Sequence, residues 1–153
     1  MGQQLNTAQL ATVCFELTIN SITVINTTPT GGSVSTATGA ASAFACPGDG
    51  NADLIQFSTT SSSPSYVYLI TDENNVIIEV VSGAGFDFEN SAQGVSRVWG
   101  LAYAGTLLAQ PGQNAATAQL ATQCFALSDN FIEIEKTTPD GGTVSLTNGE
   151  TVV

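Results

Sequence analysis

A gapless internal repeat constrains this chain more than any other feature of its sequence. Residues 2–39 align with residues 112–149 at a fixed offset, with 21 identities in 38 positions. The match is densest between TAQLATVCF at residues 7–15 and TAQLATQCF at residues 117–125. Solenoid units are about 20–50 residues long, so a period of 110 residues corresponds instead to a whole small domain. The sequence therefore predicts a piece of a tandem array of modules.

The segments TTPTGG (27–32) and TTPDGG (137–142) mark the expected junctions between modules. Proline fixes the backbone angle φ and has no N–H to donate to a strand ladder, whereas two consecutive glycines give the backbone wide conformational freedom. We place the junctions near Pro29 and Pro139, so that residues 29–138 form one complete module. Residues 1–28 are then the closing strands of a preceding module, and residues 139–153 are the first strand of the next.

The residue pattern predicts an all-β fold, because short runs rich in Thr, Val and Ile alternate with turn signals. Residues 65–81 indicate a hairpin that turns at Asp72–Asn75, and residues 131–136 place Ile132 and Ile134 on one face of a strand. Further strands are expected at 33–37, 42–46, 54–59, 86–89, 97–103 and 106–109, with one helical turn within 115–121. Seven to nine short strands in one period predict an immunoglobulin-like antiparallel β-sandwich, with a barrel as the alternative.

The charge of the chain excludes several classes of function. Its net charge is −11, Arg97 and Lys136 are its only basic residues, and it has no histidine. Binding to nucleic acid requires clustered Lys and Arg, so nucleic acid is excluded as a partner, and anionic membranes are disfavoured. No apolar run approaches the roughly 18 residues of a membrane span, so membrane insertion is not expected. No signal peptide is visible, so any export signal would lie outside the chain.

Catalysis has little support in the sequence, and we expect no enzymatic activity and no organic cofactor. Without histidine, a serine or cysteine nucleophile lacks its commonest general base. Asp87 and Glu89 share a strand face, but such a pair usually forms a solvated edge rather than a glycosidase site. Calcium is the candidate metal, with Asp49, Asp53, Asp72 and Glu73 as candidate ligands. Turn formation explains these Asx-rich stretches equally well.

The three cysteines, Cys14, Cys46 and Cys124, leave the redox pairing open. Cys14 and Cys124 are equivalent positions of the repeat. A Cys46–Cys124 disulfide would close a 79-residue loop and add about 4 kcal/mol of stability. The alternatives are a Cys14–Cys46 bond across the junction and three unpaired buried thiols.

The leading segment also predicts a way to join copies without a covalent bond. Residues 21–26 keep Ile22 and Val24 in phase with Ile132 and Ile134. This strand is therefore a candidate to add to a free sheet edge of a neighbouring copy. A covalent string of modules is the simpler arrangement.

Four segments in order carry a resemblance to a known family: CPGDGNADLIQF (46–57), YLITDENNVI (68–77), FDFENSAQGVSRVWGLAYAGTL (86–107) and CFALSDNFIEI (124–134). They resemble the repeat modules of giant secreted surface proteins of Bacteroidetes, which include the SprB-like adhesins of gliding cells. The resemblance implies an extracellular, cell-surface array that is exported by the type IX route and used in adhesion or gliding. The family usually has cysteine at the position of Ser96. This departure puts the family's disulfide pattern in doubt here and favours the Cys46–Cys124 pair.

Two functions follow as hypotheses. The first is a structural repeat of a surface adhesin or filament, which provides reach, mechanical stability and attachment through neighbouring copies of itself. The second is a carbohydrate-binding module that uses Tyr66, Tyr68 or Tyr103 against a surface polysaccharide. Strand alternation favours packing in the core for most of these tyrosines.

Overall fold

The computed structural model describes residues 12, 14, 16, 28–138 and 141–142 of the 153-residue chain. Its nine strands lie between Val34 and Lys136, and no helix forms in the described residues. The predicted all-β class is therefore confirmed. The expected strand at 21–26, with Ile22 and Val24, lies outside the described residues. All described strands fall within the predicted module 29–138, and the fold of the neighbouring modules stays a prediction.

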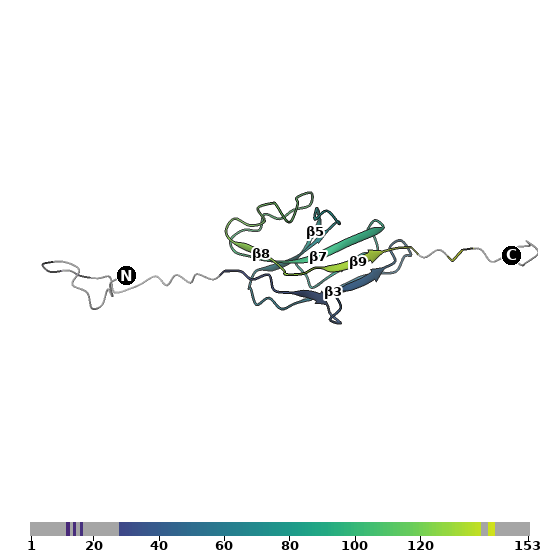
Figure 1. The fold of residues 1–153 in the computed structure, drawn as a ribbon, viewed down its shortest axis with the longest axis horizontal. Helices are drawn as coiled ribbons and strands as arrows, with labels where there is room; N and C mark the ends of the chain where they lie inside the picture. The colour runs from purple at the N-terminus through teal and green to yellow at the C-terminus, as the bar shows by residue number, and fades with distance from the viewer. Residues whose placement is uncertain (1–11, 13, 15, 17–27, 139–140, 143–153) are drawn as a thin grey trace, which may run out of the picture.

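The strands form two sheets (Figure 1). The smaller sheet has the order β1-β3-β6, with β1 at Val34–Thr36, β3 at Leu54–Thr59 and β6 at Gly85–Asp87. The larger sheet has the order β2-β9-β7-β4-β5, with β2 at Ser42–Ala45, β9 at Ile132–Lys136, β7 at Gly94–Tyr103, β4 at Tyr66–Thr71 and β5 at Ile77–Val81. Strand β8 at Phe125–Leu127 pairs with β7. The ladder between β2 and β9 is parallel, and the other ladders between these strands are antiparallel.

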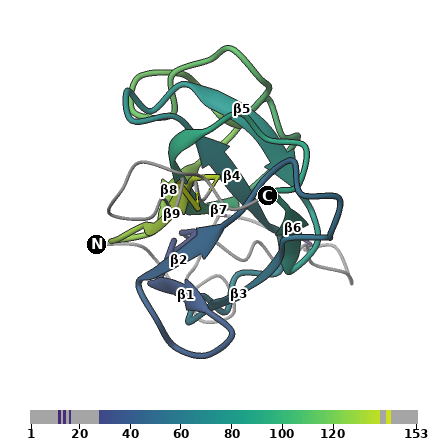
Figure 2. The same ribbon diagram turned by 90° about the vertical axis from the view of Figure 1, so that its right-hand side faces the viewer.

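The two sheets pack face to face around one apolar core. Val34 and Phe57 of the smaller sheet meet Ile70, Val98 and Ile132 of the larger one. Figure 2, which looks along the long axis, shows the two layers with β1 and β3 on one side of the larger sheet. Burial of these side chains removes apolar surface from water and holds the layers together. The fold is thus sandwich-like.

A second apolar cluster covers the outer face of the larger sheet. The connection between β7 and β8, residues 104–124, lies over this face and buries Leu120 and Ala121 completely against the sheet. It is the green segment at the top of Figure 2. The TAQLAT segment at residues 117–122 therefore belongs to a packed cover. Within it Ala118 N–H donates to Asn114 O at 2.9 Å, which is the expected single helical turn. The strand expected at 106–109 is wrong, because only the isolated bridge Leu107–Ala121 forms there.

Both alternation patterns agree with the structure. In β7 Val98 lies in the core between the sheets, whereas Leu101 lies in the outer cluster, and each is fully buried. In β9 Ile132 and Ile134 are buried, while the two glutamates between and after them are exposed. The hairpin also forms as predicted between β4 and β5, with Asn75 in the left-handed region at φ 63°.

Asn130 joins the first strand to the last. Val34 N–H donates to Asn130 Oδ1, and Asn130 Nδ2 donates to Val34 O, each at 2.8 Å. Ser128 holds the backbone of Asn130 in place. Its hydroxyl donates to the backbone carbonyl Asn130 O at 2.6 Å and accepts from Gly100 N–H at 2.9 Å. Two backbone groups of β1 that have no ladder partner on this side are thereby satisfied.

The chain enters and leaves the sandwich at opposite ends (Figure 1). At the N-terminal end the Tyr66 hydroxyl donates to Gly31 O at 2.9 Å and accepts from Thr59 Oγ1 at 2.8 Å. Gly31 lies so close to the Leu127 carbonyl that any Cβ would overlap it, which explains one glycine of the Thr-Thr-Pro-x-Gly-Gly segment. At the C-terminal end Thr137 N–H donates to Ala45 O.

Replacing Asn130 with alanine tests the link between β1 and β9. The change leaves the N–H and C=O of Val34 without their partner, so the free energy of unfolding should fall by about 2–3 kcal/mol. Asn90→Ala is the control, because Asn90 is exposed, and it should change stability by less than about 0.5 kcal/mol. Urea unfolding of both variants measures the difference, and equal midpoints would contradict the role given to Asn130.

Candidate functional site

The open edge of the larger sheet is one candidate site. Strand β2 is the last strand on this side, and no other strand of the described residues pairs with its second edge. Glu133 N–H donates to Ala41 O, and Thr137 N–H donates to Ala45 O. Because successive residues of a strand point their backbone groups to opposite edges, Ser42 and Phe44 present their N–H and C=O to the open side.

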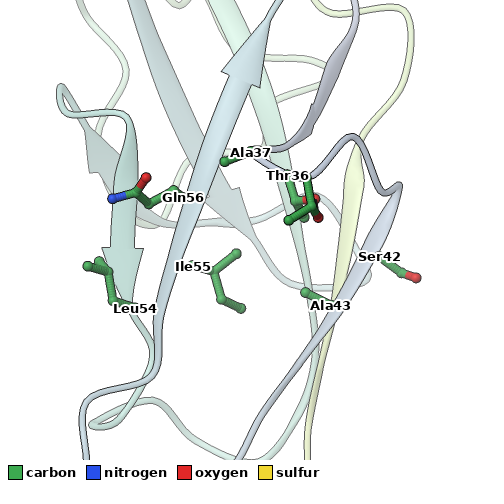
Figure 3. A pocket seen from close by; sticks show the side chains of 8 residues that line it. Thr36, Ala37, Ser42, Ala43, Leu54, Ile55 and Gln56 are labelled. Atoms are coloured by element: carbon green, nitrogen blue, oxygen red, sulfur yellow. Dashed lines mark hydrogen bonds between the residues drawn. The ribbon is translucent and has the colours of Figure 1, made fainter.

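A groove runs along this edge between β2 and β3. It has a volume of about 350 Å³. Figure 3 shows Ile55 and Ala43 pointing toward the gap between the two strands, whereas Leu54 points away from it. Ile55 and Ala43 are also packed against the core, so the floor of the groove is apolar. A further extended segment can bind here through backbone hydrogen bonds to β2.

The outer face beside this edge combines an exposed aromatic ring with carboxylates. Phe44 is 73% exposed and lies in register with Glu135, while Ser42 lies in register with Glu133. The next strand brings Arg97 opposite Glu133. Arg97 is already engaged, since its guanidinium donates to Glu73 O at 2.7 Å and lies 4.8 Å from the centre of the Phe131 ring. This face therefore has an apolar and acidic character.

Two of the tyrosines proposed as sugar platforms lie in the core. Tyr68 is 6% exposed, and its ring packs at 5.1 Å from Phe57. Tyr66 lies edge-on to Tyr68 at 5.5 Å, and both of its polar contacts are internal. Burial raises the pKa of both phenols above the ordinary value. Tyr103 is half-buried against the outer cluster and lines a cavity at the N-terminal end.

The candidate calcium ligands lie in two separate turns. Asp72 Oδ1 accepts from the N–H groups of Asn74 and Val76, so it stabilises the hairpin. Asp49 Oδ1 accepts from Asn51 N–H, and Asp53 Oδ2 accepts from Cys46 N–H. In the part of the chain that the structure describes, no three acidic, cysteine or histidine residues gather to form a metal site. Calcium binding by these residues and by Glu73 stays a prediction.

The carboxylates of Asp87 and Glu89 accept hydrogen bonds from backbone N–H groups. Asp87 Oδ1 accepts from Asp53 N–H at 2.8 Å and from Glu89 N–H at 3.1 Å. Glu89 Oε1 accepts from Gly50 N–H at 2.8 Å. These bonds fix the loop of residues 46–53 at the C-terminal end of the sandwich.

The structure places Cys46 and Cys124 too far apart to form a disulfide within one module. Cys46 follows Ala45, which pairs with Lys136 and so lies beside Gly94 at the start of β7. Cys124 precedes Phe125, which pairs with Tyr103 at the end of β7. Nine strand steps separate the two positions by about 30 Å, whereas a disulfide needs Cα atoms within about 7 Å. Cys14, Cys46 and Cys124 are all free thiols.

Lys136 is a buried residue that sequence reasoning did not single out. It is 5% exposed and lines a cavity of about 310 Å³ together with Ser96, Glu79 and Asp87. The Ser96 hydroxyl is buried without a hydrogen-bond partner. Loss of hydration lowers the pKa of the Lys136 ammonium below its ordinary 10.5. The repeat could have pointed to Lys136, because the equivalent position in the leading segment is the uncharged Asn26.

Oxidation tests the placement of the cysteines. After treatment with oxidised glutathione, the Cys14→Ser variant should contain no internal Cys46–Cys124 bond, because the fold holds these residues at opposite ends of β7. Peptide mapping by mass spectrometry of the monomer detects any such bond. The same treatment in 8 M urea is the control, in which the unfolded chain forms the bond. An internal bond in the folded monomer would contradict the register of β7, β8 and β9.

The pH dependence of stability tests the environment of Lys136. Between its lowered pKa and 10.5 the unfolded chain binds more protons than the folded module, so the free energy of unfolding rises with pH across this window. Lys136→Met keeps the volume and removes the charge, and it should raise stability at neutral pH and flatten the rise. Lys136→Arg keeps the charge and serves as the control. Urea unfolding at a series of pH values measures the slope, and an unchanged slope in the methionine variant would refute this account.

Comparison of the chain with known proteins gave no matching family model, no matching curated protein and no matching solved structure. Among the residues that the structure describes, no helix has the length and apolar character of a membrane span.

Proposed function

We propose that residues 29–138 are one immunoglobulin-like module of a tandem array, and that the array is a non-enzymatic structural repeat on an extracellular cell surface. Its work is to provide reach, mechanical stability and attachment. The partners of each module are then neighbouring copies of the same module, with surface polysaccharide as a further candidate for attachment. The family resemblance of the sequence and its acidic, lysine-poor composition support this setting.

The path of the chain between the sheets supports the immunoglobulin-like assignment. The chain leaves β1 in the smaller sheet and crosses to β2 in the larger one, so the first part of the module contributes to both layers. The last strand, β9, then runs parallel to β2, and the order β9-β7-β4-β5 completes the larger sheet. Two sheets with this division of strands are typical of immunoglobulin-like sandwiches.

The observation that carries the proposal is that the repeat retains the fully buried apolar positions of the closing segment. Leu120, Ala121 and Ile132 are fully buried, and the leading segment has the same residues at positions 10, 11 and 22. Ile134 is replaced by valine at position 24, which conserves its shape. The residues needed to cover the outer face and to close the core thus occur in both copies.

Two exposed positions of strand β9 have changed between the copies, although exposed Thr117, Gln119 and Thr122 are retained. Glu133 and Glu135 are exposed, and their equivalents in the leading segment are threonine and isoleucine. Asn130 is retained as Asn20, although the residues on either side of it, Asp129 and Phe131, have changed. Its amide makes the link to β1, so its retention follows from the fold rather than from solubility. Retention of the fully buried positions and of Asn130 is expected if the two segments close modules of one architecture.

The ends of the module suit a load-bearing role. Chain tension acts at opposite ends of the sandwich (Figure 1). The adjacent strands β2 and β9 run parallel. Such tension pulls β2 and β9 past each other, so their hydrogen bonds are loaded together rather than one at a time. A ladder loaded in this way resists force better than one that opens from its end.

Force measurements on a chain lengthened by whole periods test the proposal. Each module should unfold separately and release a similar length, roughly 35 nm for about 100 residues. Ala43→Pro should lower the unfolding force, because the N–H of Ala43 faces β9 and proline removes it. Ser42→Pro is the matched control, because its N–H faces the open edge, and it should lower the force much less. A force curve without regularly spaced events would overturn the tandem array.

A further inference from the structure

We propose that consecutive modules are joined by a rigid interface, in which the C-terminal end of one module packs against an uncharged cavity at the N-terminal end of the next. This inference rests on the tandem array proposed above and specifies how its units meet. The partner of this surface is therefore a second copy of the module.

The cavity lies where the chain enters the sandwich. It has a volume of about 580 Å³. Its walls come from three places that are far apart in the sequence: residues 28–30, residues 62–65 and residues 103–105. No Asp, Glu, Lys or Arg lines it, in a chain whose net charge is −11. An acidic partner can therefore approach this surface without facing carboxylates on the cavity wall.

The backbone is held firmly from residue 30 onward. Thr30 N–H donates to Ser63 Oγ at 3.2 Å, and Thr30 O accepts from Ser61 Oγ at 2.6 Å. The next carbonyl, that of Gly31, accepts from the Tyr66 hydroxyl. Asp129 N–H then donates to Gly32 O at 2.8 Å. Independent movement of the leading chain is thus limited to the residues before Thr30.

The other end of the module is held up to residue 138. The Thr138 hydroxyl donates to Pro47 O at 3.3 Å and accepts from Gln93 Nε2 at 2.7 Å. Pro47 begins the loop that the carboxylates of Asp53, Asp87 and Glu89 fix at this end. The chain is therefore bound to its own module as far as Thr138, directly before the junction.

The period of the repeat joins these two sets of contacts. Position 138 is equivalent to position 28, and position 140 is equivalent to position 30. Only Pro139 separates the last residue held by one module from the first residue held by the next. Two residue steps span at most about 7 Å, so the two modules must touch. Proline, with its fixed φ, removes further freedom from this single linking residue.

One repeat position contacts both modules at once. Thr28 lines the N-terminal cavity, while its equivalent, Thr138, is hydrogen-bonded to the C-terminal loop of its own module. The loop at Pro47 and the side chain of Gln93 are therefore brought to the rim of the following cavity. The glycine after the junction adopts the same backbone angle in both copies, with φ 63° at Gly32 and at Gly142. This agreement supports an equivalent path of the chain through each junction.

A chain lengthened by one period tests the rigid interface. We would join residues 1–138 to residues 29–153, replace the native cysteines with serine, and introduce one spin label at Ser58 in each complete module. Ser58 is exposed on the smaller sheet and lies outside the cavity lining. Pulsed electron paramagnetic resonance then measures the distribution of distances between the labels. The proposal predicts one narrow distribution.

Two pairs of variants make the result interpretable. Insertion of Gly-Ser-Gly-Ser after the first Thr138 should broaden the distribution by about 10 Å, whereas the same insertion at the open turn of Gly39 should not. Thr138→Val should broaden it at least about twofold, because the bonds to Pro47 and Gln93 are lost, while Thr137→Val, at an exposed neighbour, should leave it narrow.

The outcomes separate the two proposals. If both modules fold, as judged by two sets of dispersed amide signals, but the parent distribution is as broad as that of the junction insertion, the rigid interface is refuted and the array stands. If the second module does not fold in the lengthened chain, the tandem array fails, and the interface fails with it. A narrow distribution that only the junction variants broaden supports the interface.

Discussion

Strand β7 is packed on both of its faces, and the other elements depend on it. Val98 points into the core between the sheets, and Leu101 points into the outer cluster, with no exposed surface on either. The same strand forms ladders with β4, β8 and β9. A closing segment such as residues 112–138 therefore has a surface to cover and an edge to pair with only where a β7 is present. In the proposed tandem array, this dependence would make the repeat unit a whole module rather than one hairpin.

Much of the fold followed from patterns in the sequence, because half-buried strands impose a period of two. The alternation in residues 97–103 and 131–136 identified the faces of β7 and β9, and the Asx-rich turn at Asp72 identified the hairpin. The strand predicted at 106–109 is wrong, because a run of small and apolar residues is equally suited to a packed irregular cover. Local periodicity does not reveal which surface such a run lies against.

The site was less accessible to sequence reasoning, because it depends on which chain segments meet. The pairing of Cys46 with Cys124 seemed reasonable from the count of cysteines per period, yet the register of β7 separates them by its whole length. The open edge at Phe44 and the burial of Lys136 depend on strand order, which no local pattern contains. Asn130 was the exception that the repeat could have identified, since a polar residue retained among changed neighbours indicates a structural contact.

The positions of the chain ends also bear on how such a protein would change over generations. The chain enters the sandwich at one end and leaves it at the other. If the proposed array is correct, a unit cut between two Thr-Thr-Pro segments could therefore be gained or lost without disturbing a strand in its neighbours. Near-identical stretches such as TAQLAT provide places where unequal recombination pairs one copy with the next. The size of the gene product then varies in whole-unit steps, and selection on the distance that it spans acts on copy number instead of on individual side chains.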